Sequence, residues 1–315
     1  MSFQRRASRT ATLGVVFVGV LTACSDNRPD QLADVNAVPP ISVAPQSNVN
    51  SANPSLTTFV NDQVSPGDTL RLVFEDDFDG AALDPATWFF ETGDGSEYGI
   101  PGWGNNELQY YLPDSAQLED GLLKITAREE DVGAFRYTSA RINTRDRIAV
   151  RYGRIEARMK LPGGQGLWPA FWMLAQNSPY GTWAASGEID IMEADNLGAA
   201  GGNRVLGTIH YGGEFPDNVF TGGNYTVPAD PQTEFHVYAV EWDATEIRWY
   251  VDDTLYLTQN SWSSTGGAFP APFDQDFYLI FNVAVGGNLP GAPNTTTVFP
   301  VTMEIDWVRV YSGEP

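Results

Sequence analysis

From about residue 68 onward, the chain consists of short stretches in which apolar and polar residues alternate, and turn signals separate them. Residues 154–161 alternate strictly, as a β-strand with one buried face should. No apolar stripe at helical spacing exceeds two turns, so the pattern predicts an all-β protein with two stacked antiparallel sheets, a jelly-roll-type sandwich. The other predicted strands are residues 70–78, 108–112, 118–128, 135–143, 205–211, 235–242, 246–251, 255–259, 277–285 and 303–311.

The N-terminus has the features of an export signal. Three arginines within the first nine residues precede an apolar stretch, 11–23, that is too short to cross a bilayer as a stable helix. It ends in Leu21-Thr-Ala-Cys24, which resembles a bacterial lipobox, and Cys24 is the only cysteine. We therefore expect residues 1–23 to be a lipoprotein signal peptide and Cys24 to carry the lipid. The alternative is an ordinary signal peptide that contains a cysteine.

A polar segment follows the signal. Residues 25–66 are rich in Asn, Ser, Pro, Ala, Asp and Gln and lack sustained periodicity, so residues 24–67 are predicted to be a flexible, lipid-anchored linker before a domain over 68–315. Only 56–60 offers an alternative, as an edge of that domain. The residue after the lipobox cysteine is serine, not aspartate, so we expect an exported lipoprotein of the outer membrane or cell surface.

Charge limits the partners that this chain can bind. Its 18 Lys+Arg against 40 Asp+Glu give a formal net charge of −22, which disfavours nucleic acids, anionic membranes and sulfated polymers and leaves neutral ligands open. One cysteine excludes an internal disulfide, and two histidines make a His-rich metal site unexpected. Membrane contact is expected only through the lipid anchor, and the protein is expected to be a monomer.

The most informative segment is Gly187-Glu-Ile-Asp-Ile-Met-Glu193. In a strand, Glu188 and Asp190 share one face and the isoleucines share the other. Regular alternation would bury Glu193, at high cost for an unpaired carboxylate. A β-bulge at Ile191-Met192 adds one residue and returns Glu193 to the face of the other two acids. We therefore predict three carboxylates on one face.

Three neighbouring carboxylates suit glycoside hydrolysis. Their mutual repulsion raises at least one pKa, and that reaction needs an ionised nucleophile beside a protonated acid. The alternative is a solvated acidic strand, which an acidic protein has in abundance. The aromatic residues of segment 169–174 and Trp183 favour a carbohydrate cleft, because flat rings pack against the apolar faces of sugars.

These segments resemble glycoside hydrolase family 16, and the extra Met192 resembles its laminarinase-like branch. The resemblance covers about residues 68–313 and implies a β-jelly roll with a concave substrate groove and endo-hydrolysis with retention of configuration. Its motifs are Trp168-Pro-Ala-Phe-Trp-Met-Leu174, Trp183 to Gly187, Glu188 to Glu193, Asp76-Asp-Phe-Asp79, Gly104-Asn-Asn-Glu-Leu-Gln-Tyr-Tyr111, Ser139-Ala-Arg-Ile-Asn-Thr144, Gly207-Thr-Ile-His210 and Asp306-Trp-Val-Arg-Val-Tyr311.

The resemblance also implies roles for the three acids. Glu188 corresponds to the nucleophile, Glu193 to the general acid/base, and Asp190 to the acid that holds Glu188 in its working state. The chain departs from the family pattern at Ala184, where the family often has a proline, so the loop that carries Trp183 is expected to be less well fixed. A smaller departure is the aspartate at position 77, where a glutamate is common.

Around the acids, the resemblance implies substrate-binding positions. Trp183 is expected at the subsite of the cleaved bond, with core filling as the alternative. Trp168 and Trp172 are four residues apart, so either both line the groove or a bend buries one. His210 is expected beside Glu193 or a sugar hydroxyl, against a purely structural histidine.

Two further positions match the glycone end of the groove. They are Asn105 and Arg141, whose alternatives are a turn-capping amide and a surface ion pair. Glu107, near the first of them, is expected to be structural.

No cofactor is expected for catalysis, but the family often carries a structural calcium ion on the convex side. The matching positions are the backbone carbonyls of Asp77 and Gly121 and the side chain of Asp306. Hard oxygen ligands from distant segments suit calcium. The alternative is a hydrogen-bonded structural aspartate at position 306, in a strand that looks buried.

The leading hypothesis is therefore an endo-β-1,3-glucanase acting on neutral, laminarin-like glucans. Alternatives are a mixed-linkage β-1,3-1,4-glucanase, another specificity on the same scaffold, a glucan-binding protein that has lost catalysis, and a structural envelope lipoprotein. The presence of all three acids argues against the third alternative, and the tryptophans beside them argue against the last.

Overall fold

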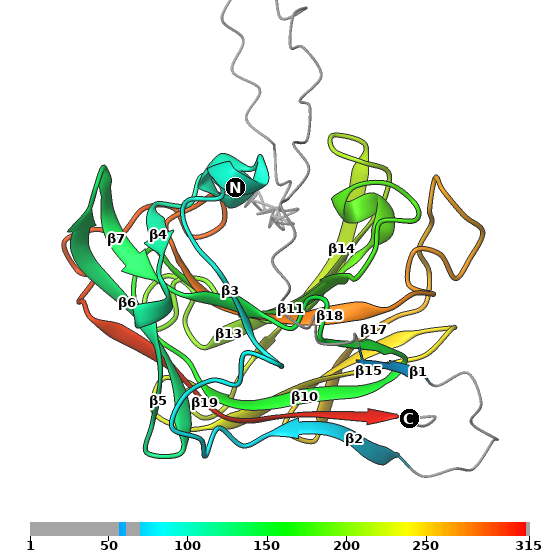
Figure 1. Ribbon diagram of the computed structural model, residues 1–315, viewed down its shortest axis with the longest axis horizontal. Helices are drawn as coiled ribbons and strands as arrows, with labels where there is room; N and C mark the ends of the chain where they lie inside the picture. The colour runs from blue at the N-terminus through cyan, green and yellow to red at the C-terminus, as the bar shows by residue number, and fades with distance from the viewer. Residues whose placement is uncertain (1–56, 61–69, 313–315) are drawn as a thin grey trace, which may run out of the picture. The chain divides into compact units, whose positions relative to one another are not determined.

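The computed structural model describes residues 57–60 and 70–312 (Figure 1). In this part of the chain, the strands form two mostly antiparallel sheets, and the helices are short 3-10 turns. The nine-stranded sheet contains β1 (Thr57–Val60), β3 (Phe89–Glu91), β8 (Arg141–Asn143), β9 (Ile148–Arg151), β11 (Leu167–Ala175), β12 (Glu188–Glu193), β13 (Arg204–Gly212), β14 (Asn218–Thr226) and β18 (Phe277–Val285). The ten-stranded sheet contains β2 (Arg71–Asp76), β4 (Gln109–Tyr111), β5 (Ala116–Glu119), β6 (Leu122–Val132), β7 (Phe135–Ser139), β10 (Gly153–Lys160), β15 (His236–Trp242), β16 (Ile247–Val251), β17 (Thr254–Gln259) and β19 (Val301–Ser312). The 3-10 turns are η1 (Ser96–Tyr98), η2 (Pro101–Gly104), η3 (Pro113–Ser115) and η4 (Trp183–Ser186).

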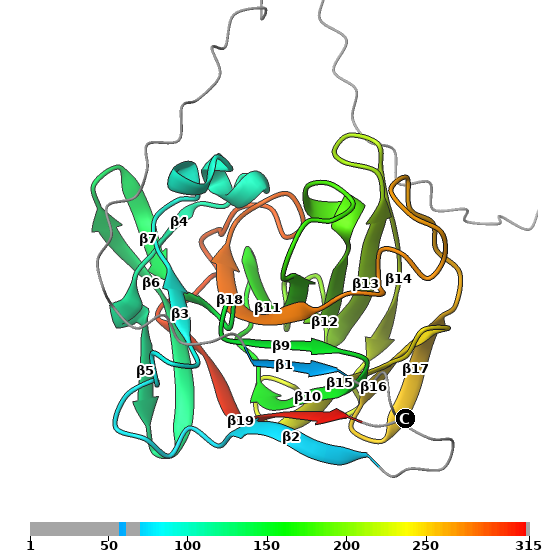
Figure 2. The same cartoon turned by 45° about the vertical axis from the view of Figure 1, so that its right-hand side comes forward.

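The two sheets stack as layers and enclose one core (Figures 1 and 2). The order of the nine-stranded sheet is β1-β9-β18-β11-β12-β13-β14, so β12 lies between two long partners, well away from the sheet edges. Large aromatic side chains such as Phe171, Phe281 and Trp249 fill the space between the sheets. The predicted all-β jelly-roll sandwich is confirmed. No helix in the described ranges is long and apolar enough to span a membrane.

Most predicted strands are found, but two of them divide. The predicted strand 118–128 is the hairpin β5–β6, because Asp120 and Gly121 take φ values of 59° and 71° and form its turn. The predicted strand 135–143 breaks at Ala140, where the chain passes from β7 in one sheet to β8 in the other. Strands β3, β9 and β14 were not predicted.

Strand β1 lies within the predicted linker 24–67. It pairs in parallel with β9, so residues 57–60 form the edge strand that was the alternative for this segment. The other positions of the predicted linker, 24–56 with Cys24 and 61–67, lie outside the described residues, as does the predicted signal peptide 1–23.

Candidate active site

A β-bulge in β12 sets the geometry of the acids. Between Asp190 and Glu193, β12 advances three residues while its partner β13 advances two, and the register against β11 shifts at the same place. The bulged residues Ile191 and Met192 are both buried in the core. Glu193 therefore returns to the face of Glu188, as the sequence predicted.

Each glutamate of this strand accepts a hydrogen bond from its own tryptophan. The indole Nε1 of Trp183 donates to Oε2 of Glu188 at 2.9 Å. The indole Nε1 of Trp168 donates to Oε1 of Glu193, also at 2.9 Å. Asp190 lies between the two glutamates in the sequence and is 3% exposed. The strand thus presents two glutamates with separate indole donors and a buried aspartate between them.

His210 of β13 faces the first two acids. Its Nε2 lies 3.5 Å from Oε1 of Glu188 and 3.4 Å from Oδ2 of Asp190. These distances are long for a hydrogen bond, and Asp190 Oδ2 has no hydrogen-bond partner among the described residues. The interaction is therefore mainly electrostatic. The imidazole also lies between aromatic rings, with centroids 5.5 Å from Trp183 and 5.7 Å from Phe220.

Burial and mutual repulsion shift the ionisation of this cluster. Burial, followed by the charge of Asp190, raises the pKa of Glu188 to about 7 and that of Glu193 to about 8. Burial by itself lowers the pKa of His210, but the facing carboxylates outweigh it and raise that pKa to about 9. Around neutral pH the histidine is therefore a cation, and both glutamates hold their protons more firmly than an exposed glutamate does.

The same atoms lie close enough together to suggest a metal site. The ligand atoms of Glu188, Asp190 and His210 are all within 4.8 Å of one another. A metal-binding imidazole must be unprotonated at the nitrogen that binds, whereas the raised pKa of His210 favours the imidazolium. A metal ion would therefore have to displace a proton from His210 before it could bind all three groups.

The loop that carries Trp183 is held at several points. The backbone N and Oγ1 of Thr182 both donate to Oε1 of Glu214, and Ser186 hydrogen-bonds back to the start of the loop. Ala184 is fully buried. These bonds and this burial are contacts that hold the loop in the absence of the proline, and its mobility stays a prediction. Trp183 itself is 39% exposed, which also argues against a core-filling role.

Trp168 and Trp172 are both partly exposed, so no bend buries either of them. The indole Nε1 of Trp172 donates to Oδ1 of Asn282 at 2.7 Å. The guanidinium of Arg141 lies 4.7 Å from the ring centroid of Trp172 and pairs with Glu91. Both side chains of that ion pair are 7% exposed, so Arg141 forms a buried pair and not the surface pair that was its alternative.

Asn105 belongs to a second polar network. Its Nδ2 donates to Oε1 of Glu107 at 3.3 Å, and its carbonyl accepts from the backbone N of Asn288 at 2.8 Å. Glu107 is buried and also accepts hydrogen bonds from Gln109 and Tyr111. Burial raises the pKa of Glu107. This environment agrees with a structural role for Glu107.

Phe220 is a site residue that sequence reasoning missed. It pairs with His210 in the register of β13 and β14, so the two side chains share a face, and Phe220 is 64% exposed. Strand β14 contains Gly222 and Gly223, which weaken its strand pattern. An exposed phenylalanine in a segment without a clear pattern gave no usable signal.

The environment of Asp306 differs from the prediction. Its side chain is 32% exposed, and Oδ2 lies 2.5 Å from Nη1 of Arg158 on β10. Arg158 of β10 pairs with Trp307, and the next residue of β10 pairs with Ile305, so the register skips Asp306. Asp306 therefore does not follow the regular alternation of β19. The strand looked buried at this position, but Asp306 is partly exposed, and its bond to Arg158 agrees with the alternative of a hydrogen-bonded structural aspartate. The other two predicted calcium positions, Asp77 and Gly121, lie in the connections after β2 and before β6.

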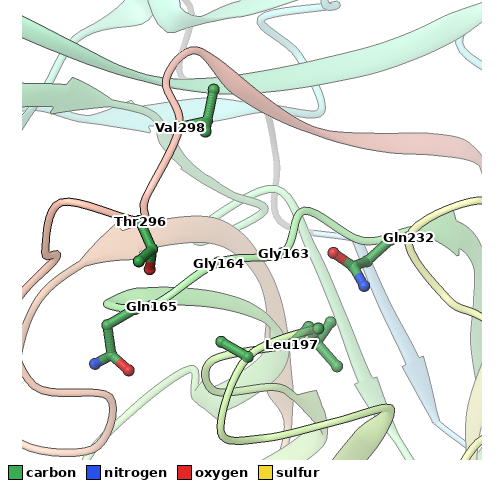
Figure 3. A pocket seen from close by; sticks show the side chains of 9 residues that line it. Gly163, Gly164, Gln165, Leu197, Gln232, Thr296 and Val298 are labelled. Atoms are coloured by element: carbon green, nitrogen blue, oxygen red, sulfur yellow. The ribbon is translucent and has the colours of Figure 1, made fainter.

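A hollow of about 360 Å³ lies apart from the acids (Figure 3). Its lining includes none of the three carboxylates of β12 and none of the predicted substrate-binding tryptophans. Gln232 reaches into the same region and packs against Gly163 and Gly198. The lining residues are Gly163, Gly164, Gln165, Leu197, Gly198, Ala199, Gln232, Thr296 and Val298.

Comparison with known proteins identifies the family. The family model described as glycosyl hydrolases family 16 matches residues 103–309, which include the whole of β12. The chain belongs to this family. A second family model, beta-glucan synthesis-associated protein SKN1/KRE6/Sbg1, matches residues 11–190 and so ends before Glu193. The resemblance to family 16 expected from the motifs is confirmed.

Several relatives and a solved structure are similar to most of this chain. It is 44% identical over 265 residues to glucan endo-1,3-beta-glucosidase A1 of Niallia circulans, covering 78% of this chain but only 38% of that protein. It is 41% identical over 252 residues to a beta-glucanase of Rhodothermus marinus, covering 76% and 85% of the two chains. The crystal structure of the laminarinase catalytic domain from Thermotoga maritima MSB8 matches with a TM-score of 0.70 and 40% identity, covering 79% of this chain and all of that one.

Proposed function

We propose that this chain is a retaining endo-glycosidase that hydrolyses β-1,3-glucosidic bonds in laminarin-like glucans. The observation that carries the proposal is the bulged strand β12, which brings Glu188 and Glu193 to one face with a separate indole donor for each. The relatives named as glucan endo-1,3-beta-glucosidase and laminarinase support the β-1,3 linkage.

The mechanism uses the two glutamates in different ionisation states. The Glu188 carboxylate attacks the anomeric carbon, and the bond to the leaving oxygen breaks as Glu193 gives that oxygen its proton. Glu193, now ionised, then takes a proton from water, and the resulting hydroxide displaces Glu188 from the sugar. The raised pKa of Glu193 supports the acid role, because it lets this carboxyl keep its proton near neutral pH.

Asp190 and His210 adjust these ionisation states in opposite directions. The charge of Asp190 raises the pKa of both glutamates, whereas the imidazolium of His210 lowers both. In the first step Glu193 becomes a carboxylate as the Glu188 carboxylate becomes an ester, so the negative charge moves along the strand and does not build up. The cation of His210 stabilises the Glu193 carboxylate that exists between the two steps.

The proposed groove lining suits a neutral polysaccharide. Trp183 and Phe220 present exposed aromatic faces on either side of His210, and the net charge of −22 repels anionic polymers. Arg141 is held in a buried ion pair, so we propose that it acts on substrate by orienting Trp172. Asn105 is partly buried and bonded to Glu107, and we propose that it contacts the substrate at the glycone end of the groove.

A product assay tests the proposed activity. Purified protein is incubated with laminarin, barley β-glucan, agarose and carrageenan, and the products are separated by size. We expect laminarin to give short oligosaccharides at the highest rate. Glu188→Gln should abolish hydrolysis of every substrate, whereas Glu119→Gln, on an exposed side chain, should leave it intact. Faster cleavage of barley β-glucan would support the mixed-linkage alternative, and failure to cleave any β-glucan would overturn the proposal.

We further propose that Cys24 anchors the mature protein to a membrane through a lipid. The support is the lipobox-like Leu21-Thr-Ala-Cys24 and the absence of any other cysteine in the chain. Cys24→Ala should release the protein from the membrane fraction without changing its specific activity. Continued membrane attachment of that variant would contradict the anchor.

A structural calcium ion is also proposed, held by Asp306 and the carbonyls of Asp77 and Gly121. The strand registers support it: β2 pairs with β19 as far as Val308, and β6 pairs with it as far as Ile305. The segment that follows β2 therefore meets β19 just after Asp306 in the sequence, and the segment that precedes β6 meets it just before Asp306. Arg158 competes with calcium for that carboxylate.

A further inference from the structure

One hydrogen bond crosses the core to the backbone of the acid-bearing strand. The indole Nε1 of Trp249 donates to the carbonyl oxygen of Asp190 at 2.8 Å. Trp249 lies on β16 of the ten-stranded sheet, whereas Asp190 lies on β12 of the other sheet (Figure 2). Trp249 is fully buried, so water does not compete for this bond.

The bond is made where the regular ladder of β12 breaks. Asp190 is the last residue paired with β13 before the register shift, and pairing resumes at Glu193. A bulge leaves its extra residue unpaired and disrupts the ladder locally. The carbonyl that Trp249 holds therefore belongs to the residue at which the irregular stretch begins.

A glycine opens the path that the indole takes. Gly207 is the single β13 residue opposite the two bulged residues, Ile191 and Met192. The residues of β13 on either side of this glycine pair with Asp190 and Glu193, which flank the bulge. A Cβ at position 207 would lie 2.4 Å from Cδ1 and 2.7 Å from Nε1 of Trp249. No positive φ requires glycine there, so the requirement is for space. Gly207, which faces the bulge, therefore has no side chain in the path of the Trp249 indole.

We propose that Trp249 is a positioning residue, whose indole N–H passes the gap at Gly207 and fixes the bulge of β12 through the Asp190 carbonyl. The inference rests on the proposed function, because the bulge sets how Glu188 and Glu193 face the scissile bond. Trp249 touches neither substrate nor the reacting atoms. Its effect is on the backbone between the two glutamates, where a small displacement changes their relative position.

The chain offers a matched control in Trp242. It is also fully buried between the sheets, on the neighbouring strand β15, and its Nε1 has no hydrogen-bond partner among the described residues. Trp249→Phe and Trp242→Phe each remove part of a buried indole. Only the first removes a hydrogen bond to β12, so the difference between the two variants isolates that bond.

The experiment compares melting temperature, kcat and KM for laminarin hydrolysis by the two variants and the wild type. Both variants should melt at lower temperature, because each leaves a cavity. Trp249→Phe should in addition lose kcat by about 10- to 100-fold with nearly unchanged KM, because misplacing reacting groups by about 1 Å costs up to that much. Trp242→Phe should keep kcat. Equal kcat in the two variants would overturn the proposal.

Two additions keep the test decisive. If Trp249→Phe does not fold, 3-benzothienylalanine at position 249 keeps the shape of the ring and replaces only the N–H with sulfur, and the same loss of kcat is expected.

If the wild type cleaves no β-glucan, the proposed function fails, but the positioning role is still measurable by carbon-13 NMR titration of the glutamates. Trp249→Phe should then move the titrations of Glu188 and Glu193, and Trp242→Phe should not; unmoved titrations in the first variant would overturn the positioning role.

Discussion

The indole Nε1 of Trp183 lies 2.9 Å from Oε2 of Glu188, five residues further along the chain. Trp168 makes the equivalent bond to Glu193. A donor to a carboxylate favours its ionised form, so each bond opposes the effect of burial on the pKa of its glutamate. Burial and the charge of Asp190 act on both acids and hold both pKa values above that of an exposed glutamate.

Separate roles for the glutamates predict different behaviour when each is removed. Glu193→Ala should lose most activity on laminarin but still form the glycosyl-enzyme from an activated aryl glycoside, whose leaving group needs no proton. Added azide should then accelerate turnover by attacking that intermediate, which initial rates with and without azide will measure. Absence of azide rescue in this variant would contradict the acid/base role of Glu193.

Removal of the proposed nucleophile should have the complementary outcome. Glu188→Ser should abolish hydrolysis, yet it should join an α-glycosyl fluoride donor to an acceptor, because the donor mimics the intermediate and the small side chain leaves room for it. Product analysis by mass spectrometry checks this. If Glu188→Ser gave azide-rescued hydrolysis and Glu193→Ala did not, the roles of the two glutamates would be reversed.

The pH dependence of kcat/KM tests the electrostatics of His210. The proposed mechanism needs Glu188 ionised and Glu193 protonated, so kcat/KM should fall below a pH of about 7 and above a pH of about 8. His210→Gln removes a cation that lowers both pKa values, so both limbs should move to higher pH by about 1 unit.

The second histidine of the chain is the control for this test. The Nδ1 of His236 lies 2.9 Å from Oδ2 of Asp252, and neither glutamate titration depends on it. His236→Gln should therefore leave the profile unchanged. Limbs that stay in place in His210→Gln would show that the imidazolium does not influence the acids.

The bulge could be predicted because it is a local consequence of sequence. The isoleucines at 189 and 191 fix which face of the strand is buried, and the cost of burying Glu193 requires one extra residue. Strands β10 and β18 were likewise predicted, because their apolar residues either alternate or run continuously. Pattern and covalent spacing suffice for such features.

Other features depend on contacts that no local pattern reports. The pair of Glu91 and Arg141 joins residues 50 positions apart, and only the fold shows that it is buried. Asp306 looked buried because its neighbours alternate, but a register shift against β10 places it beside Arg158. Register shifts caused by a partner strand are absent from the sequence of either strand.

Chelation tests the proposed calcium ion. A ligand that binds only the native state raises stability by mass action, so excess EDTA should lower the melting temperature of the wild type. It should not lower that of Asp306→Ala, which lacks the only side-chain ligand proposed. Laminarin hydrolysis below the melting temperature should not change, because the ion would lie on the other sheet from β12. Equal melting temperatures with and without chelator would contradict the calcium site.

The buried ion pair of Arg141 and Glu91 should contribute to both stability and the groove. Arg141→Met leaves the Glu91 carboxylate buried without its counter-ion, which should destabilise the fold by about 3–5 kcal/mol in urea unfolding. It also removes the guanidinium from the ring of Trp172, so KM for laminarin should rise more than kcat falls. Adding Glu91→Gln removes the unpaired charge and should recover part of the stability but not the KM.

An exposed pair supplies the comparison for this last prediction. Arg136 pairs with Glu129 on side chains that are 69% and 43% exposed. Arg136→Met should change neither unfolding nor KM measurably, because exposed ion pairs contribute little and solvent replaces the lost partner. If Arg141→Met also changed neither unfolding nor KM, the pair of Arg141 and Glu91 would be neither required for stability nor coupled to Trp172. If Glu91→Gln also restored KM, the loss of binding would come from the unpaired carboxylate and not from the missing guanidinium.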